Sequence, residues 1–385
     1  MAVLTQPIAV FASFSGAGGV ERMLVNLMRG FIDLGRPVDL LLAGSDSPHL
    51  ARLPVAVRRV DLGSRHTLLA AISLARYLRG ERPRVLLAAK DRAGRAAVLA
   101  RRMTGTDTRI LLRLGTNLSA AMAGRSAFDR WLRYAPIRAL YSGIEQIAAV
   151  SEGVAEDTAL IAHYPRERIR VIRNPVVTPE LVQDAALPCP HPWLDTHRDR
   201  RIPVIVGAGR LQRQKDFPTL IQAFAALRRR RPCRLIIIGD GRARAALEQQ
   251  IARFGIGDDV SLPGFQDNPY PFLGNADLFA LSSAWEGSPN VLTEAMALGT
   301  PVVATDCPSG PREILDHGRF GALVPIGDAA ALSEAMLQTL EHPTPRQRLI
   351  DAVQEYSQEV SATRYLELLE AQPGTAATKE PNAVA

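Results

Sequence analysis

Short apolar runs alternate with longer amphipathic segments through the first half of the chain. The apolar runs have the length of buried strands, and the segments between them repeat apolar residues every three or four positions, as helices do. Strands are predicted at residues 8–14, 38–42, 85–89, 110–114 and 147–150, with helices at 20–34, 68–79 and 92–103. Because strands without alternating polar positions are buried on both faces, this pattern predicts a parallel sheet covered by helices on each side.

Prolines interrupt the alternation between residues 181 and 203, at positions 188, 190, 192 and 203, and this stretch is predicted to link two domains. The alternation then resumes. Strands are predicted at 204–208, 235–238, 260–262, 278–281 and 302–304, and helices at 217–229, 242–254, 290–298, 329–341 and 346–370. The predicted organisation is an N-terminal domain at 1–180, a C-terminal domain at 204–345, closing helices at 346–371, and a small, polar tail at 372–385 that is expected to be disordered.

The length of the chain agrees with two domains, because 385 residues with 47% hydrophobic content exceed what one core usually holds. The predicted fold class is therefore α/β, with two doubly wound, Rossmann-like parallel-sheet domains. Ligands of such sheets bind beyond the carboxyl ends of the strands. The predicted site is the cleft between the two domains.

Positive charge is concentrated in the first half of the chain. Residues 1–180 contain 26 Lys and Arg against 15 Asp and Glu, a net charge of +11, whereas residues 181–385 carry a net charge of −4. This asymmetry predicts an anionic partner, either a phosphorylated acceptor or a membrane surface. Nucleic acid is disfavoured, because the basic residues are not interleaved with aromatic ones.

The remaining composition excludes several classes of protein. The three cysteines, Cys189, Cys233 and Cys307, are far apart, which argues against a disulfide framework or a structural zinc site. No basic residue precedes the apolar run at 8–14, so this run is interpreted as a strand rather than an export signal, and no run is long enough to span a bilayer. A cytoplasmic protein is expected.

The most informative motif is EGSPNVLTE at residues 286–294, between two predicted strands. Residues Gly287, Ser288 and Pro289 favour a turn, and Asn290 can begin a helix. The N–H groups of such a turn and helix start form a site suited to a diphosphate. Glu286 and Glu294 could accept hydrogen bonds from hydroxyls of a sugar and of a ribose. The alternative is two solvated glutamates around an ordinary helix N-terminus.

A second motif follows the first strand of the C-terminal domain. Arg210 and Lys215 lie on this strand-to-helix connection, where phosphate is commonly bound. Lysine occurs only at 90, 215 and 379, in a chain whose other basic residues are arginines, which favours a function for Lys215 over a solvated loop. The glycine-rich loop at 15–21 does not match the dinucleotide-binding pattern, so a dinucleotide site is disfavoured.

These motifs resemble the bacterial members of glycosyltransferase family 4, retaining enzymes with the GT-B fold, over about residues 6–370. The resemblance is carried by segments 18–22 (GGVER), 174–176 (NPV), 209–216 (GRLQRQKD), 239–241 (GDG), 264–265 (GF), 286–294 and 299–305 (GTPVVAT). The run at 307–313 (CPSGPRE) resembles members that build bacterial surface glycans.

The resemblance implies a role for each matching residue. Arg210 and Lys215 would neutralise the donor diphosphate in place of a metal, Glu286 would bind the transferred sugar, and Glu294 would bind the ribose. The other implied donor-binding residues are Gly18 and Gly19, Phe265 beside the base, and Gly287, Ser288, Pro289 and Asn290. No cofactor and no metal are expected. The implied donor is a nucleotide diphosphate hexose or N-acetylhexosamine, with uridine as the expected base, and the implied acceptor is a glycan or a lipid-linked saccharide.

The sequence departs from the family at the first domain. Many relatives have a histidine near the donor sugar, where this chain has Arg113 or Asn117. Lys90 follows another strand of the same predicted sheet, so we expect Lys90, Arg113 and Asn117 near a basic acceptor pocket facing the cleft. The alternative is that Lys90 and Arg113 are solvated. The helix at 356–370 resembles the family's C-terminal helix that returns to the first domain.

One segment suggests a membrane surface. Residues 125–141 place Arg125, Arg130, Arg133 and Arg138 beside Phe128, Trp131, Leu132 and Tyr134. Basic and aromatic residues on one helix suit a lipid headgroup interface, and the alternative is an ordinary helix packed on the sheet. For the whole chain, the alternatives to a glycosyltransferase are a GT-B epimerase or phosphorylase and a non-catalytic protein that binds nucleotide sugars.

Overall fold

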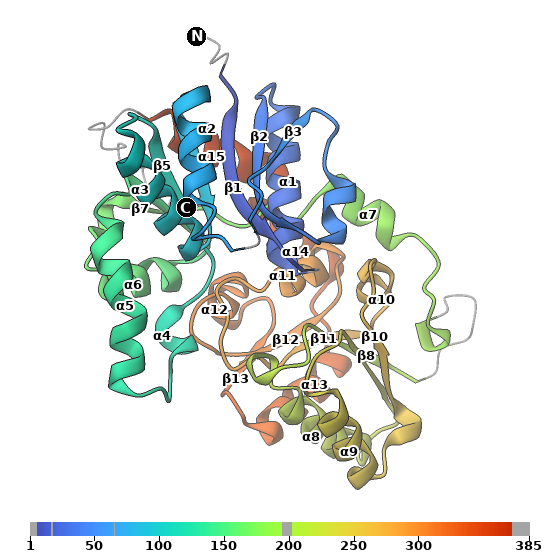
Figure 1. Ribbon diagram of the computed structural model, residues 1–385. Coiled ribbons are helices and arrows are strands. Elements are labelled where there is room, and N and C mark those ends of the chain that lie inside the picture. Colours follow the sequence, from blue (N-terminus) through green and yellow to red (C-terminus); the bar gives the residue numbers. More distant parts are fainter. Residues whose placement is uncertain (1–5, 17, 65, 195–201, 372–385) are drawn as a thin grey trace, which may run out of the picture.

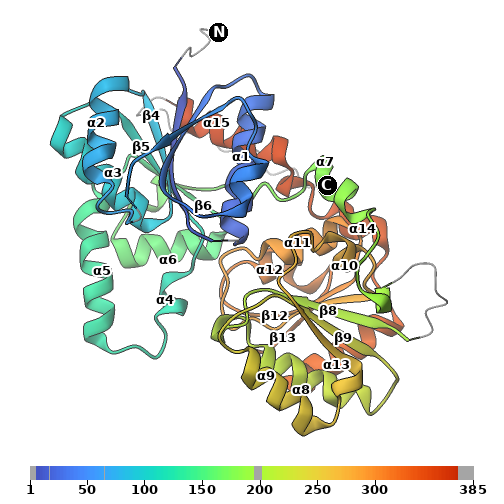
Figure 2. The same cartoon turned by 45° about the vertical axis from the view of Figure 1, so that its right-hand side comes forward.

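The computed structural model describes residues 6–16, 18–64, 66–194 and 202–371. Two parallel sheets, each flanked by helices, form two lobes (Figure 1 and Figure 2). The first sheet has the order β3-β2-β1-β4-β5-β6-β7 and consists of β1 (Ile8–Phe14), β2 (Val38–Ser45), β3 (Val57–Asp61), β4 (Val85–Ala89), β5 (Arg109–Leu114), β6 (Gln146–Ala149) and β7 (Ile169–Val171). The second has the order β10-β9-β8-β11-β12-β13 and consists of β8 (Val204–Ala208), β9 (Arg234–Ile238), β10 (Val260–Gly264), β11 (Leu278–Leu281), β12 (Val302–Thr305) and β13 (Ala322–Val324). The predicted fold class is confirmed.

Helices cover both faces of each sheet. The first lobe contains α1 (Gly19–Asp33), α2 (Ala71–Glu81), α3 (Asp91–Thr104), α4 (Leu118–Ala121), α5 (Ala127–Tyr141), α6 (Glu152–Ala162) and the C-terminal α15 (Gln358–Glu370). The rest of the chain forms α7 (Pro179–Ala185), α8 (Phe217–Arg228), α9 (Arg244–Phe254), α10 (Tyr270–Gly274), α11 (Asn290–Ala297), α12 (Pro311–Ile314), α13 (Ala329–Glu341) and α14 (Arg346–Asp351). None of the helices in the described part of the chain has the length and hydropathy of a membrane span.

The apolar strands are buried on both sides, as their sequence predicts. In β1, Ala9 and Phe11 face the core under α2, α3, α5 and α6, whereas Val10 and Ala12 face the core under α1 and α15. This alternation follows from the two-residue period of a strand. A strand between two helical layers needs apolar residues at nearly every position, and β1 has them everywhere except at Ser13.

Three strands were not predicted: β3, β7 and β13. Each lies at an edge of its sheet, where one side of the strand is open. In β3, Arg58 and Arg59 are exposed, so the run of apolar residues is broken. Strands β7 and β13 have three residues each, too few to show a period. Edge strands tolerate polar residues because they do not need burial on every side.

The single C-terminal helix predicted at 346–370 is wrong. It is divided into α14 and α15 by a turn at which Ser357 begins the second helix, its hydroxyl accepting a hydrogen bond from the N–H of Val360 at 3.3 Å. The break allows the chain to change direction and leave the second lobe. The predicted tail, 372–385, lies outside the described residues, as does part of the predicted linker.

The chain crosses between the lobes twice, and the two crossings lie side by side. Val176 N–H and Val177 N–H both donate to Tyr356 C=O at 3.0 Å. After the second crossing, α15 packs on α1 in the first lobe (Figure 2). The contact is close, because a Cβ atom at Gly30 would lie 2.6 Å from Ala362 Cβ.

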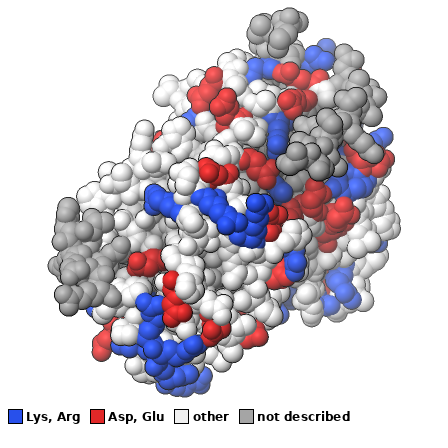
Figure 3. All heavy atoms as spheres, turned by 180° about the vertical axis from the view of Figure 1, so that it is seen from behind, with Lys and Arg blue, Asp and Glu red and all other residues white. Residues whose placement is uncertain are grey.

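Charged side chains of both signs are interspersed on the face seen in Figure 3. The upper part of this face belongs to the lobe of the first sheet, which carries the excess of positive charge in the sequence. Its basic residues are accompanied there by acidic ones. The excess therefore does not form a uniform basic surface on this face.

Candidate active site

The turn at residues 286–290 lies where the two lobes meet. It follows β11 and leads into α11. A side chain at Gly287 would collide with the backbone of Gly115, which follows β5 in the first lobe. Asn290 donates a hydrogen bond from Nδ2 to the C=O of Gly19 at 3.1 Å. The N-terminus of α11 therefore faces the start of α1 across the boundary between the lobes.

Lys215 and Glu286 form an ion pair beside this turn. Lys215 Nζ lies 2.6 Å from Glu286 Oε1, and both side chains are largely buried. Ser283 Oγ donates to the same carboxylate oxygen at 2.7 Å. The ammonium group fixes the carboxylate, and it retains donors for a further oxygen because an ammonium has three. The sequence motifs indicate both residues but do not indicate that they pair.

Arg210 is exposed on the same connection, in contrast to the largely buried Lys215. Its side chain makes no hydrogen bond or ion pair with any residue that the structure describes. Its Nη2 lies 4.0 Å from the Cβ position of Gly16, in the loop after β1. Arg210 thus reaches from the second lobe toward the first, and its guanidinium is available to an anion in the cleft.

Glu294 is buried one turn inside α11. Its Oε1 accepts a hydrogen bond from Tyr270 OH at 3.5 Å and lies 3.9 Å from Arg22 Nη1. Burial raises the pKa of Glu294, and the positive charge of Arg22 opposes this shift. Arg22 comes from α1 in the first lobe, and its Nη2 also donates to Asp267 C=O at 3.3 Å. In the sequence, Arg22 is visible only as part of the motif at 18–22, which assigns it no role.

The remaining donor-binding predictions lie around the same boundary. Gly18 and Gly19 begin α1, and a Cβ atom at Gly19 would lie 3.3 Å from Asn290 Nδ2. Ser288 and Pro289 precede α11 in the turn, and Phe265 follows β10 with its side chain 46% exposed. Both predicted glycines and the turn at 286–290 are thus brought together, whereas Phe265 lies beyond the end of another strand.

Arg113 lies in the interior rather than in solvent. It is 2% exposed, and burial lowers its pKa. Its Nη2 donates to Asn174 Oδ1 at 2.7 Å, and Asn174 Nδ2 donates to Asn290 Oδ1 at 2.8 Å. The alternative that Arg113 is a solvated residue is therefore wrong. Its side chain supports Asn290 through Asn174, and Arg113 is also among the residues that line a cavity.

The side chain of Asn117 makes hydrogen bonds to both lobes. Its Oδ1 accepts a hydrogen bond from Ala120 N–H at 2.9 Å, and this bond caps the N-terminus of α4. Its Nδ2 donates to Ser309 Oγ at 2.9 Å. Ser309 belongs to the second lobe. Asn117 is therefore a contact between the lobes.

Lys90 has an unusual backbone. It follows β4 with φ 78° and ψ 155°, a backbone conformation that residues other than glycine seldom adopt. Its Nζ lies 3.2 Å from the buried Glu21 Oε1, and its N–H donates to Arg113 C=O at 3.0 Å. The side chain is 45% exposed. A strained backbone held in place at the carboxyl end of a strand is typical of functional positions.

A cavity of about 400 Å³ opens beside Lys90 in the first lobe. Its lining includes Lys90, Asp91, Arg113, Arg133, Ile137 and Tyr141. Asp91 accepts hydrogen bonds from Arg133 at 2.8 Å and from Tyr141 OH at 3.1 Å. The cavity therefore combines cationic groups with aromatic and aliphatic side chains from α5. Of the three predicted acceptor-binding residues, Lys90 and Arg113 line it, and Asn117 lies between two lining residues, Thr116 and Leu118.

Two family models match the chain, one in each lobe. Residues 17–179 match Glycosyltransferase Family 4, and residues 202–342 match Glycosyl transferases group 1. Among proteins, the chain is 35% identical over 233 residues to the lipopolysaccharide core biosynthesis glycosyltransferase LpsE of Rhizobium meliloti, covering 59% of this chain and 64% of LpsE.

A second relative is matched over more of its length. It is the N-acetylgalactosamine-N,N'-diacetylbacillosaminyl-diphospho-undecaprenol 4-alpha-N-acetylgalactosaminyltransferase of Campylobacter jejuni, 26% identical over 87% of this chain and 90% of that protein. Among solved structures, Anabaena HepE in complex with UDP and glucose superposes with a TM-score of 0.74 at 19% identity, covering 94% of this chain and 99% of that one. The fold and the two family models agree: the chain belongs to the two-domain glycosyltransferases that carry a Family 4 domain followed by a group 1 domain.

Proposed function

We propose that this protein transfers a hexose or N-acetylhexosamine from a nucleotide diphosphate sugar to a glycan or lipid-linked acceptor in the synthesis of a bacterial surface polysaccharide. The observation that carries the proposal is the Lys215–Glu286 pair at 2.6 Å, which lies beside the N-terminus of α11 at the boundary between the lobes. Cations and helix N–H groups suit a diphosphate, and a fixed carboxylate suits the hydroxyls of a sugar.

The donor would lie across the turn at 286–290. In this arrangement the first N–H groups of α11, which have no partner within the helix, face the diphosphate, and Arg210 and Lys215 neutralise its charge. Glu286 would accept hydrogen bonds from the transferred sugar and Glu294 from the ribose. We propose UDP as the nucleotide, in keeping with the UDP bound in the structure of HepE. The charge that a metal could supply would come from the two basic side chains.

The proposed reaction retains the configuration at the anomeric carbon. The acceptor hydroxyl attacks from the face on which the diphosphate leaves, the bond from the anomeric carbon to the diphosphate breaks, and the departing phosphate oxygen takes the proton of the hydroxyl. Two hydrogen-bond donors, Lys215 and Ser283, already engage Glu286 Oε1. This engagement favours a binding role for Glu286 over that of a nucleophile.

The acceptor would enter the cavity beside Lys90. Lys90 and Arg113 provide positive charge, and α5 provides an apolar wall, which together suit a phosphate-bearing saccharide. The Campylobacter relative is named for an acceptor that contains a diphospho-undecaprenol group, which supports this acceptor class. Lys90 is the more accessible of the two cations and is the proposed contact with the phosphate.

We also propose that α5 attaches the first lobe to the inner face of an anionic membrane. Phe128, Trp131 and Leu132 are 67%, 58% and 57% exposed, and Phe128 stacks on Trp131 with ring centroids 6.1 Å apart. Arg125 and Arg130 are exposed beside them. Helix α5 projects from the lobe together with α4 (Figure 2). Such a cluster suits the headgroup region of a bilayer.

Contacts within the protein limit the part of α5 that is available to a membrane. Of the basic residues predicted for it, Arg133 pairs with Asp91 at 2.8 Å and Arg138 donates to Ile161 C=O at 2.9 Å, so both are used within the protein. Ile137 and Tyr141, in the last turns of α5, are buried. The alternative of a helix packed on the protein thus describes the C-terminal half of α5, and the proposed membrane contact is confined to its N-terminal half.

A screen of nucleotide sugars tests the proposed reaction. Ligands that raise the melting temperature would identify the donor, because binding to the folded state stabilises it. Incubation of that donor with lipid-linked diphosphate saccharides should then release the nucleotide and give a glycoside of unchanged anomeric configuration, as read by NMR. An isomerised nucleotide sugar without release of nucleotide would support an epimerase instead. Binding without any turnover would support a non-catalytic binding protein.

A further inference from the structure

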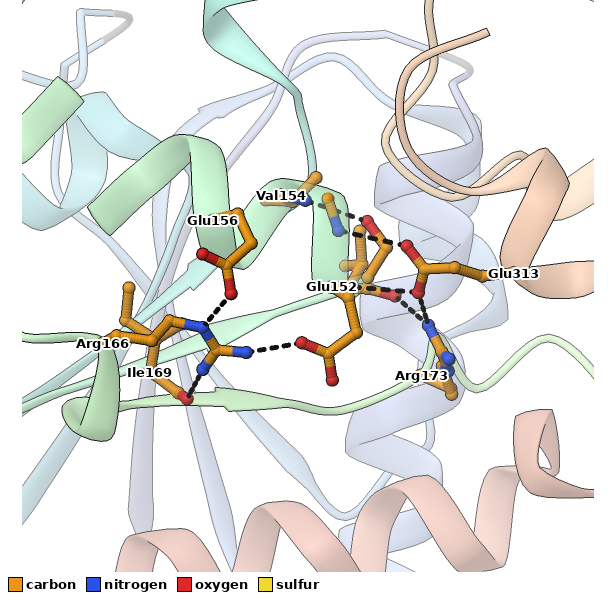
Figure 4. Close-up of polar contacts among 10 residues, drawn as sticks. Glu152, Val154, Glu156, Arg166, Ile169, Arg173 and Glu313 are labelled. Atoms are coloured by element: carbon orange, nitrogen blue, oxygen red, sulfur yellow. Dashed lines mark hydrogen bonds and ion pairs between the residues drawn. The ribbon is translucent and has the colours of Figure 1, made fainter. Parts of the chain in front are cut away.

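A carboxylate of the second lobe completes the start of a helix in the first. Glu313 of α12 accepts hydrogen bonds from the N–H of Glu152 at 2.9 Å and from the N–H of Gly153 at 3.1 Å (Figure 4). The next N–H of α6, that of Val154, donates to Ser151 Oγ at 3.2 Å. The first three N–H groups of α6 are thereby satisfied, and two of them depend on the other lobe.

The acidic residue of α6 itself does not fill this position. Glu152 turns away and pairs with Arg166 Nη2 at 2.5 Å, and Arg166 Nε pairs with Glu156 at 2.7 Å (Figure 4). An acidic side chain in the first turn often stabilises its own helix. Here Glu152 pairs with Arg166 instead, and Glu313 accepts the hydrogen bonds from the N-terminus of α6.

Glu313 is also tied to the place where the chain crosses between the lobes. Its Oε2 accepts a hydrogen bond from Arg173 Nη1 at 2.6 Å. Arg173 follows β7 at the first crossing, and its guanidinium lies 5.7 Å from the ring centroid of Tyr356 at the second. One carboxylate thus accepts from a helix N-terminus and from a guanidinium, and hydrogen bonds between such charged partners are stronger than those between neutral ones.

The segment before Glu313 packs against the proposed donor turn. Gly310 has φ +86°, and a Cβ atom there would lie 2.7 Å from Pro289 Cδ and 3.0 Å from Gly287 C=O. Its neighbour Ser309 accepts the hydrogen bond from Asn117 of the first lobe. The loop between β12 and α12 is therefore held between the first lobe and the turn at 286–290. A shift of Glu313 relative to α6 would move this turn.

We propose that Glu313 is a positioning residue that sets the angle between the lobes and so places the turn at 286–290 against Gly19 and Gly115. The inference rests on the proposed function in taking this turn as part of the donor site. A carboxylate is required because Glu313 receives three donors and offers none. A glutamine would present an NH₂ group to at least one of these donors, although it has the same size.

Glu313→Gln tests the proposal, with Glu341→Gln as the matched control. Glu341 is an exposed carboxylate at the end of α13 that makes no ion pair in the described part of the chain. Hydrogen exchange reports on the contact directly. At least one of the amides of Glu152 and Gly153 should exchange roughly tenfold faster in Glu313→Gln, because a broken hydrogen bond to a charged group has about this effect, and both should exchange at their normal rates in the control. Unchanged exchange in both variants would overturn the proposal.

Binding, kinetics and scattering test whether Glu313 positions the turn at 286–290. In Glu313→Gln we expect UDP to bind with its normal dissociation constant by calorimetry, whereas kcat falls roughly tenfold and small-angle scattering shows an altered radius of gyration. Normal kcat with normal scattering would overturn the positioning role even if exchange increased. If the unmodified protein binds no UDP, the proposed donor is wrong, and exchange and scattering still decide whether Glu313 sets the angle between the lobes.

A charge reversal separates the helix contact from the ion pair. The double variant Arg173→Glu with Glu313→Arg restores opposite charges at these two positions and removes the contact of Arg173 with Glu355 at 3.5 Å, but an arginine cannot accept hydrogen bonds from the N–H groups of α6. Exchange at Glu152 and Gly153 should therefore stay fast in this double variant. Restoration of slow exchange would show that the ion pair alone holds the lobes and would overturn the role assigned to the helix N-terminus.

Discussion

At the scale of single residues, the two basic side chains of the proposed phosphate site differ in their contacts. Their replacement by alanine should therefore affect stability differently. Arg210 is exposed and without a partner among the described residues, whereas Lys215 pairs with the buried Glu286. Replacing either by alanine should lower kcat/KM by roughly 100-fold, as for loss of one preorganised electrostatic group. Only Lys215→Ala should also lower the melting temperature, because it leaves a buried carboxylate without its cation.

The neighbouring Arg213 provides the control for this prediction. It is exposed on the same connection between β8 and α8, and its side chain has no ion pair in the part of the chain that the structure describes. Arg213→Ala should keep normal kinetics and a normal melting temperature. Normal kinetics in both Arg210→Ala and Lys215→Ala would remove these two residues from the phosphate role.

Lys90 allows a test of the acceptor pocket that leaves the donor site intact. Its side chain borders the cavity of about 400 Å³ and contacts Glu21, and it makes no hydrogen bond to the turn at 286–290. Lys90→Ala should raise KM for a phosphate-bearing acceptor by roughly tenfold, as expected for loss of one charged hydrogen bond, with nucleotide binding unchanged. Arg113→Ala should affect both substrates, because Arg113 supports Asn290 through Asn174. An unchanged acceptor KM in Lys90→Ala would place the acceptor elsewhere.

At the scale of elements, the N-terminal half of α5 exposes a cluster of large apolar side chains. We expect Phe128→Ser with Trp131→Ser to abolish flotation with vesicles that contain phosphatidylglycerol, because these rings supply the apolar contact. Arg125→Gln or Arg130→Gln should weaken binding about fivefold each, since one basic residue near an anionic surface contributes about 1 kcal/mol. Ile72→Ser on α2, which is also exposed, is the control. Flotation that is independent of anionic lipid would contradict the prediction.

At the scale of the whole molecule, the packing of α15 on α1 returns the end of the chain to the first lobe. Gly30→Ala would place a methyl group 2.6 Å from Ala362 Cβ and 3.3 Å from Gln358 C=O, so α15 would have to move. We expect a loss of about 1–3 kcal/mol in the free energy of unfolding, as for overpacking. Gly80→Ala, in α2, meets no atom within 4 Å and should instead stabilise the protein by about 0.5–1 kcal/mol. Denaturant unfolding of both variants measures the difference, and equal effects would contradict the tight contact.

The local sequence pattern was sufficient to predict the central strands and the turn around Glu286. Strands such as β1 and β4 are apolar at nearly every position because both faces are buried, and this is visible in the sequence without knowledge of their neighbours. The turn at 286–290 has its own residue chemistry, with glycine, proline and an asparagine at the helix start. The two-domain α/β architecture and the proposed donor turn could therefore be predicted from local sequence alone.

What the tertiary structure decided is which distant residues meet. The edge strand β3 has no continuous apolar pattern, and it is a strand because β2 pairs with it. Arg113 lines the cavity beside Lys90, but it is also buried and linked to Asn290 through Asn174, and Glu313 reaches α6 from a position 160 residues away in the chain. Periodicity and local motifs encode the face that an element buries and the turn that it can make. The partner of each buried charge depends on how the two lobes pack, which no local segment of the sequence specifies.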